Sequence, residues 1–141
     1  MLVSSFAWPR QPARGPAGSQ SLNAEPDCLK VVDTLRQAAL ELGVDINVNS
    51  TTGGDHDPRS DHYIYEAIDI NRIDHRPVGD PTVRDLVERL QDFFAQQPYN
   101  RENFGPTRND KAYTPRGKRI PTPSAAAKHR DHVHLSLHVN Q

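Results

Sequence analysis

The chain has 141 residues, the size of one domain with a modest core, and only 35% of them are hydrophobic. Its formal net charge of −1 argues against nucleic acid or an acidic membrane surface as a partner, and no apolar run is long enough for membrane insertion. The single cysteine, Cys28, excludes an internal disulfide and a cysteine-rich zinc site.

Residues 1–26 are predicted to form a flexible arm or linker that joins the domain to a further one. Residues 9–26 are rich in Pro, Gly, Ala, Ser and Gln and show no apolar period. Residues 1–8 lack the basic start and the sustained apolar run of a cleavable signal peptide. We therefore expect the folded domain to span residues 27–141. Action outside the cytoplasm would need export by a non-Sec route or as part of a larger protein.

Two helices are predicted from the spacing of apolar residues. The first covers residues 27–42, where apolar side chains recur at helical spacing and Gly43 supplies a left-handed stop. The second covers residues 82–96, which carry one apolar stripe. It is preceded by Asp80, a good N-cap, and by Pro81 at the first helical position.

Three short strands are predicted from alternation with period two, at residues 44–49, 67–71 and 132–139. Each has one apolar face and one polar face. The Pro- and Gly-rich segment 97–128 reads as long loops with a short strand near residues 102–105. The expected fold class is α+β, a small antiparallel sheet with helices packed on one face and a polar groove on the other.

Histidine and aspartate residues gather on the polar faces of two predicted strands. His132 and His134 are two apart and project from the same face, with their Cα atoms about 7 Å apart. Asp69 lies on the polar face of another strand, and His62 precedes it by seven residues. Two imidazoles and a carboxylate with an open fourth position are typical of a catalytic zinc site, and Asp131 is placed to serve as its general base. Taken separately, each half also fits a solvated strand edge or a turn cap.

Both halves resemble the motifs of a known family. Residues 60–70 read Ser-Asp-His-Tyr-Ile-Tyr-Glu-Ala-Ile-Asp-Ile and match the signature Ser-x-His-x-x-Gly-x-Ala-x-Asp. Residues 131–134 read Asp-His-Val-His and resemble the second motif, an acidic residue three before the last zinc-binding histidine. Over roughly residues 27–140 the chain thus resembles the zinc D-alanyl-D-alanine and L-alanyl-D-glutamate peptidases. Their wider group includes the lysostaphin-type enzymes and the hedgehog signalling domain.

This resemblance implies a fold, a cofactor and a reaction. The zinc ligands would be His62, Asp69 and His134. Asp131 would be the catalytic base, His132 would stabilise the oxyanion or orient the substrate, and Ser60 would hydrogen-bond the substrate. The implied fold is hedgehog- or DD-peptidase-like, with Zn²⁺ in the polar groove. The implied reaction is hydrolysis of peptidoglycan stem peptides by a zinc-activated water, as a D-Ala-D-Ala carboxypeptidase or an L-Ala-D-Glu endopeptidase.

The chain departs from the family pattern at several positions. Tyr65 stands where the family has glycine, so the turn differs there or Tyr65 fills part of the cleft as a substrate-binding residue. Asp131 replaces the more frequent glutamate, and the aromatic residue often found before His-x-His is missing. The family's substrate-binding arginine has no counterpart in its usual place, and Arg59 and Arg72 are the candidates to replace it.

Other readings stay open. The runner-up is a non-catalytic, zinc-stabilised binding module of the same fold, which the departures favour. A cupin or non-haem iron oxygenase also uses His-x-His, but two strong helices argue against a pure β-barrel. A peptidoglycan peptidase would act in the periplasm or cell wall as a lysin, a remodelling enzyme or a secreted toxin. His75 and His129 are interpreted as surface residues, and His138 as lying past the site.

Overall fold

A computed structural model describes residues 3–4, 17–50 and 67–138. The helices of this part of the chain are α1 (Ala17–Leu42), η1 (Pro81–Val83), α2 (Arg84–Ala95) and η2 (Pro123–Lys128), of which η1 and η2 are 3-10 helices. The strands are β1 (Val3–Ser4), β2 (Ile46–Ser50), β3 (Ala67–Ile73), β4 (Arg76–Pro77), β5 (Asn100–Phe104), β6 (Asn109–Lys111), β7 (Ile120–Pro121) and β8 (Val133–Leu137). No helix in these ranges is both long enough and apolar enough to cross a membrane.

One sheet contains all the described strands, in the order β1-β2-β3-β8-β5-β6-β7, with β4 paired to β3. The pairs are antiparallel except for β1 with β2, which is parallel. The predicted α+β class with an antiparallel sheet and helices is therefore confirmed. The last strand of the sequence, β8, lies between β3 and β5, so it joins the two halves of the sheet.

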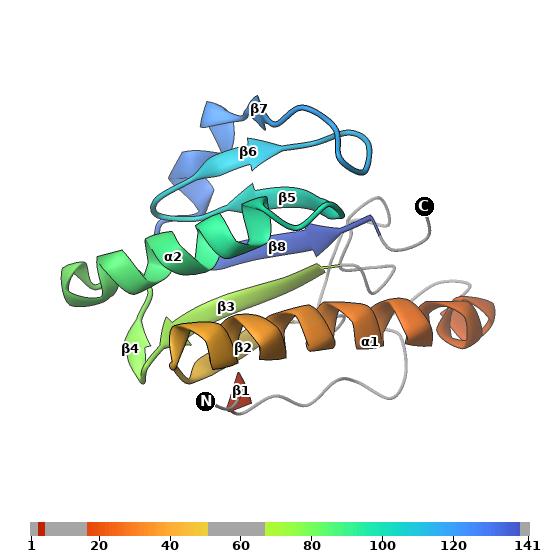
Figure 1. Cartoon of the computed structure of the whole chain (residues 1–141), viewed down its shortest axis with the longest axis horizontal. Helices are drawn as coiled ribbons and strands as arrows, with labels where there is room; N and C mark the ends of the chain where they lie inside the picture. Colours follow the sequence, from red (N-terminus) through yellow and green to blue (C-terminus); the bar gives the residue numbers. More distant parts are fainter. Residues whose placement is uncertain (1–2, 5–16, 51–66, 139–141) are drawn as a thin grey trace.

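The core lies between the sheet and the two long helices, which cover the same face (Figure 1). Leu35 of α1, Leu90 and Phe94 of α2, Ile70 of β3 and Leu135 of β8 are all fully buried there. Burying such a side chain contributes roughly 1.5–3 kcal/mol, so this layer holds β3 and β8 firmly in register.

The ends of the helices follow the local signals in part. Gly43 has a φ of 68° directly after α1, as predicted for its stop. Before α2, the Asp80 side chain accepts a hydrogen bond from the Thr82 backbone N–H at 2.9 Å, and Pro81 opens the η1 turn. The predicted start of α1 at residue 27 was wrong, because the helix begins at Ala17. Adding a residue to a helix that has already formed costs little free energy, so the first turns of α1 can form without an apolar stripe.

Strand β5 carries one extra residue relative to β8. Asn100 pairs with Leu137 and Asn103 pairs with Leu135, so three steps along β5 match two steps along β8. This irregularity is a β-bulge, in which two residues of one strand oppose a single residue of its partner. Successive side chains of a strand point to opposite faces of the sheet. The extra residue therefore moves each side chain after it to the face opposite the one it would occupy in a regular strand.

The bulge decides which face Glu102 occupies. In an unbroken strand, Glu102 would share a face with Asn100 and point toward the helices. After the bulge it instead shares a face with Phe104, which pairs with His134 of β8. The single inserted residue therefore turns an acidic side chain to the face of the sheet opposite the helices.

A buried polar network supports this bend from the helix side. Gln91 of α2 is fully buried, and its Nε2 donates to Asn103 Oδ1 at 3.0 Å. Its Oε1 accepts from the Thr107 backbone N–H at 3.0 Å and from the Thr107 hydroxyl at 2.6 Å. A Cβ atom at Gly105 would lie 2.8 Å from the Gln91 amide, so only glycine leaves room for it. The helix thus clamps both ends of the turn between β5 and β6.

Replacing Gln91 with leucine is expected to lower the free energy of unfolding by about 1–3 kcal/mol, since Asn103 Oδ1 and the Thr107 donors would lose a buried partner. Urea unfolding measures this change. The matched control is Gln96→Leu at the exposed position directly after the same helix, which should alter stability by less than about 0.5 kcal/mol. Equal stability of the two variants would contradict the clamping role of Gln91.

Candidate functional site

Two of the three predicted zinc ligands meet across neighbouring strands. Asp69 of β3 and His134 of β8 are directly paired in the sheet, although 65 positions separate them in sequence. The ring Nδ1 of His134 lies 3.0 Å from Asp69 Oδ1. The His134 side chain is 10% exposed and the Asp69 side chain is 16% exposed. The sheet order therefore creates this contact, with the polar faces of both strands aligned.

A second carboxylate approaches the same ring from β5. The Nε2 atom of His134 lies 2.8 Å from Glu102 Oε2. Burial by itself lowers the pKa of His134, but its hydrogen bonds to Asp69 and Glu102 outweigh burial and raise that pKa to about 9. For Glu102 burial acts in the opposite direction and by itself raises the pKa of the carboxyl group. The hydrogen bond and charge interaction with His134 outweigh burial, so the pKa of Glu102 falls below its usual value. The pocket around the ring thus favours positive charge.

Imidazole and carboxylate groups are residue types that bind divalent metals in proteins. A metal-bound histidine presents one bare ring nitrogen to the ion and donates its other N–H to a carboxylate. In this structure each ring nitrogen of His134 faces a carboxylate, Asp69 at Nδ1 and Glu102 at Nε2, and the Glu102 contact corresponds to the supporting carboxylate of such a histidine. Within the described ranges no group of three or more His, Cys, Asp or Glu side chains is arranged to hold a metal ion. The third predicted ligand, His62, lies outside the described residues.

The predicted base and its neighbour form a pair at the start of β8. His132 Nδ1 donates to Asp131 Oδ1 at 2.8 Å. The Asp131 side chain is 90% exposed, whereas that of His132 is 25% exposed. The hydrogen bond from His132 is the main cause that lowers the pKa of Asp131. Asp131 is therefore an ionised carboxylate that faces solvent while its partner ring is held against the protein.

A polar hollow opens beside this pair. It has a volume of about 300 Å³ and is lined by Asp131, His132, Asn71, Arg72 and Pro77. Of the two arginines considered for substrate binding, Arg72 is thus next to the predicted base. Its guanidinium also donates to the backbone carbonyl of the following turn, at His75, over 3.2 Å.

His129 lies against both histidines of the second motif, which its interpretation as a surface residue did not anticipate. It is half-buried, and its Nδ1 donates to the Ala125 carbonyl at 2.7 Å. Its ring centre lies 4.7 Å from that of His132 and 5.8 Å from that of His134. Phe104 stacks on His134 with a centroid distance of 5.7 Å. The close spacing of three histidines at positions 129, 132 and 134 was the available sequence signal, and burial lowers the pKa of His129.

The remaining predicted residues fall into two groups. Ser60, Arg59, His62 and Tyr65 lie in residues 51–66, outside the part of the chain that the structure describes. His138 is described, and it is buried with Nε2 donating to the Ala112 carbonyl at 2.9 Å. That contact accounts for His138 through packing, in keeping with its expected place past the site.

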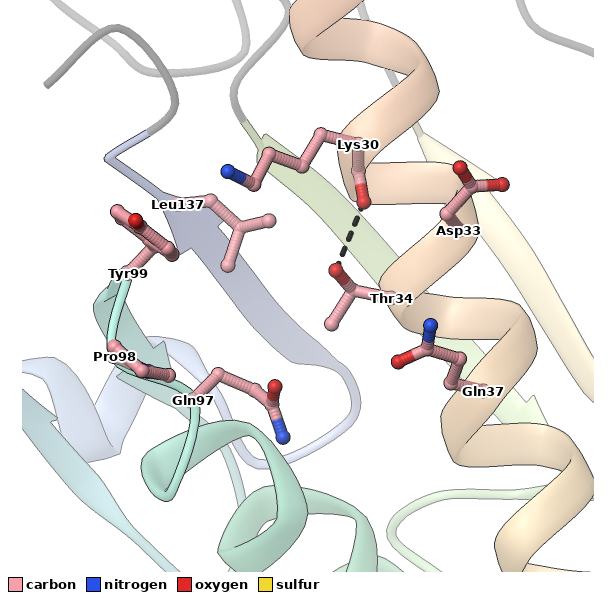
Figure 2. A pocket seen from close by; sticks show the side chains of 8 residues that line it. All are labelled: Lys30, Asp33, Thr34, Gln37, Gln97, Pro98, Tyr99 and Leu137. Atoms are coloured by element: carbon pink, nitrogen blue, oxygen red, sulfur yellow. Dashed lines mark hydrogen bonds between the residues drawn. The ribbon is translucent and has the colours of Figure 1, made fainter.

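A larger cavity lies elsewhere, between α1 and the turn that follows α2 (Figure 2). Its volume is about 420 Å³, and its lining residues are Lys30, Asp33, Thr34, Gln37, Gln97, Pro98, Tyr99 and Leu137. The Lys30 ammonium sits 4.0 Å from the centre of the Tyr99 ring. None of the predicted catalytic or metal-binding residues lines this cavity, so size alone does not mark the candidate site.

Comparison with family models, with curated proteins and with solved structures finds no match to this chain. Inferences about its activity consequently depend on its motifs and on the geometry of the described side chains.

Proposed function

We propose that this chain is a zinc metallopeptidase that hydrolyses peptide bonds in peptidoglycan stem peptides. The observation that carries the proposal is the contact between Asp69 and His134, which come from the two separate motifs and meet at 3.0 Å. The Asp131–His132 pair directly before the same strand adds a base that lines a polar hollow. A solvated histidine-rich edge, the competing interpretation of the second motif, accords poorly with a His134 side chain that is only 10% exposed.

The residues that would hold zinc are His62, Asp69 and His134. One carboxylate and two imidazoles leave a fourth position open, as catalytic zinc sites do. When bound there, zinc would polarise the scissile carbonyl and make a water molecule more acidic.

The chain's own residues supply the proton transfer. Asp131 is ionised and exposed, so its carboxylate can accept a proton from the attacking water and later deliver it to the leaving amine. His132 keeps its Nδ1–H on Asp131, which aims the other ring edge away from that carboxylate. When the Nε2 atom of His132 also carries a proton, that N–H stabilises the negative charge that develops on the carbonyl oxygen.

The hollow suits a peptide with an acidic group near the cleaved bond. The exposed residue Arg72 lines the same hollow as Asp131 and His132. An arginine binds carboxylates through two parallel N–H donors. Both D-Ala-D-Ala and L-Ala-D-Glu segments carry such a carboxylate, so the hollow is consistent with either cleavage.

Digestion of purified peptidoglycan tests the proposal. The zinc-loaded protein is expected to release fragments whose masses report loss of D-Ala or separation of L-Ala from D-Glu. Chelator-treated protein should release none, because the ion is required for hydrolysis. A zinc-loaded protein that leaves both peptidoglycan and its isolated stem peptides intact would overturn the peptidase proposal in favour of the non-catalytic binding module.

A further inference from the structure

We propose that Glu102 is the positioning residue of this centre, holding the His134 ring so that Nδ1 is turned toward the metal. The inference rests on the proposed function, since it assigns a role at the same site. Glu102 lies in the segment interpreted from sequence as mostly loops, and no motif points to it.

The contacts around His134 leave its ring little freedom. Glu102 Oε2 is 2.8 Å from Nε2, and Asp69 Oδ1 is 3.0 Å from Nδ1. Phe104 covers one face of the ring, with an angle of 17° between the two planes. The ring is therefore held at both nitrogens and on one face, which defines its rotamer.

The position of Glu102 relative to the ring distinguishes a supporting role from direct ligation. The two nitrogens of an imidazole point to different sides of the ring. Glu102 lies beside Nε2, whereas Asp69 lies beside Nδ1, so Glu102 is on the opposite side of the ring from the predicted ligand Asp69. When a metal ion replaces the proton on Nδ1, the Glu102 carboxylate accepts the hydrogen bond from Nε2–H, which keeps the remaining proton on Nε2 and makes Nδ1 a better metal donor.

The fold builds this position through the β5 bulge. The extra residue turns Glu102 to the face of His134, and the Glu102 backbone N–H donates to Ser136 Oγ at 3.0 Å. Asn100 Nδ2 bridges the two strands at the same point, donating to the Glu102 carbonyl at 3.1 Å and to the Ser136 carbonyl at 2.9 Å. Bulges commonly re-aim a side chain beside an active site, and this one has its backbone fixed on both strands.

The test compares Glu102→Leu and Glu102→Gln with the wild type. Zinc affinity is measured by competition with a chelator. The His134 tautomer in the zinc-loaded protein is read from long-range ¹H–¹⁵N correlations of the ring nitrogens. Glu102→Leu is expected to weaken zinc binding about 10- to 100-fold and to lose the defined Nε2–H tautomer. Glu102→Gln keeps an oxygen acceptor, so it should retain the tautomer and lose less affinity. Glu88→Leu, on the exposed surface of α2, is the control and should match the wild type.

The outcomes separate this inference from the function on which it rests. If the wild type binds zinc and cleaves peptidoglycan while Glu102→Leu keeps full affinity and the same tautomer, the role of Glu102 is wrong and the peptidase proposal stands. If the wild type binds no zinc, both are wrong. If Glu102→Leu does not fold, Glu102→Gln provides the test. A changed His134 tautomer in Glu102→Gln with unchanged zinc affinity would overturn the positioning role, because the tautomer would then have no effect on metal binding.

Discussion

Asp131→Asn is expected to reduce kcat for stem-peptide hydrolysis by about 10²- to 10⁴-fold while zinc stays bound. Asparagine keeps the shape of the side chain and still accepts a hydrogen bond from His132, but its amide oxygen is too weak a base to take a proton from water. The substitution should leave the fold unchanged, because the Asp131 side chain is 90% exposed. Peptide hydrolysis and zinc content, measured on the same preparation, check both parts of the expectation.

The control for this variant is Asp33→Asn, which lies at the larger cavity on α1 (Figure 2). Hydrolysis should be unaffected there if the chemistry occurs at the strand site. Full activity in Asp131→Asn with zinc bound would show that another group accepts the proton. Loss of activity in Asp33→Asn but not in Asp131→Asn would indicate that the substrate binds at the cavity beside α1.

Asp69→Asn is expected to abolish tight zinc binding and, with it, hydrolysis. The amide preserves the volume of the side chain, yet it removes the negative charge and leaves a neutral carbonyl oxygen, which binds a divalent ion more weakly than a carboxylate does. The loss of affinity should exceed the 10- to 100-fold drop typical of a supporting residue. Metal analysis after dialysis gives the stoichiometry, and chelator competition gives the affinity.

A second histidine–aspartate pair provides the matched control for Asp69. His75 Nε2 lies 3.2 Å from Asp45 Oδ2 at the turn after β3, where the His75 side chain is 75% exposed. Asp45→Asn should therefore leave zinc content unchanged. Zinc bound as tightly by Asp69→Asn as by the wild type would rule out Asp69 as a ligand and remove the main support for the peptidase proposal.

Several features of this molecule are encoded in short stretches of sequence. The Gly43 stop of α1 and the turn that Asp80 caps depend on capping and on backbone angles that a few residues set by themselves. That turn is the 3-10 helix η1, and α2 follows it from Arg84, two residues later than the predicted start at residue 82. The alternation in residues 67–71 likewise predicted that Ile68 and Ile70 would be buried while Asp69 faced the other way. These expectations were confirmed because the physical causes are local.

Other features depend on which strands become neighbours. The polar face of β8 was expected to line a groove, yet His134, Ser136 and His138 are all buried. The reason is that β8 lies at the centre of the sheet between β3 and β5, so neighbouring side chains and the segment after η2 close over it. Periodicity specifies two faces of a strand but not what covers each one.

By itself, the sequence determined the class of fold, the two helices, the strand faces and the candidate residues Asp69, Asp131 and His134, since each follows from spacing along the chain. The tertiary structure alone decided that Asp69 and His134 touch, and that Glu102 and His129 join them. Those contacts arise from sheet order and from one inserted residue in β5. Both depend on the free energy of packing distant segments together, which no local pattern records.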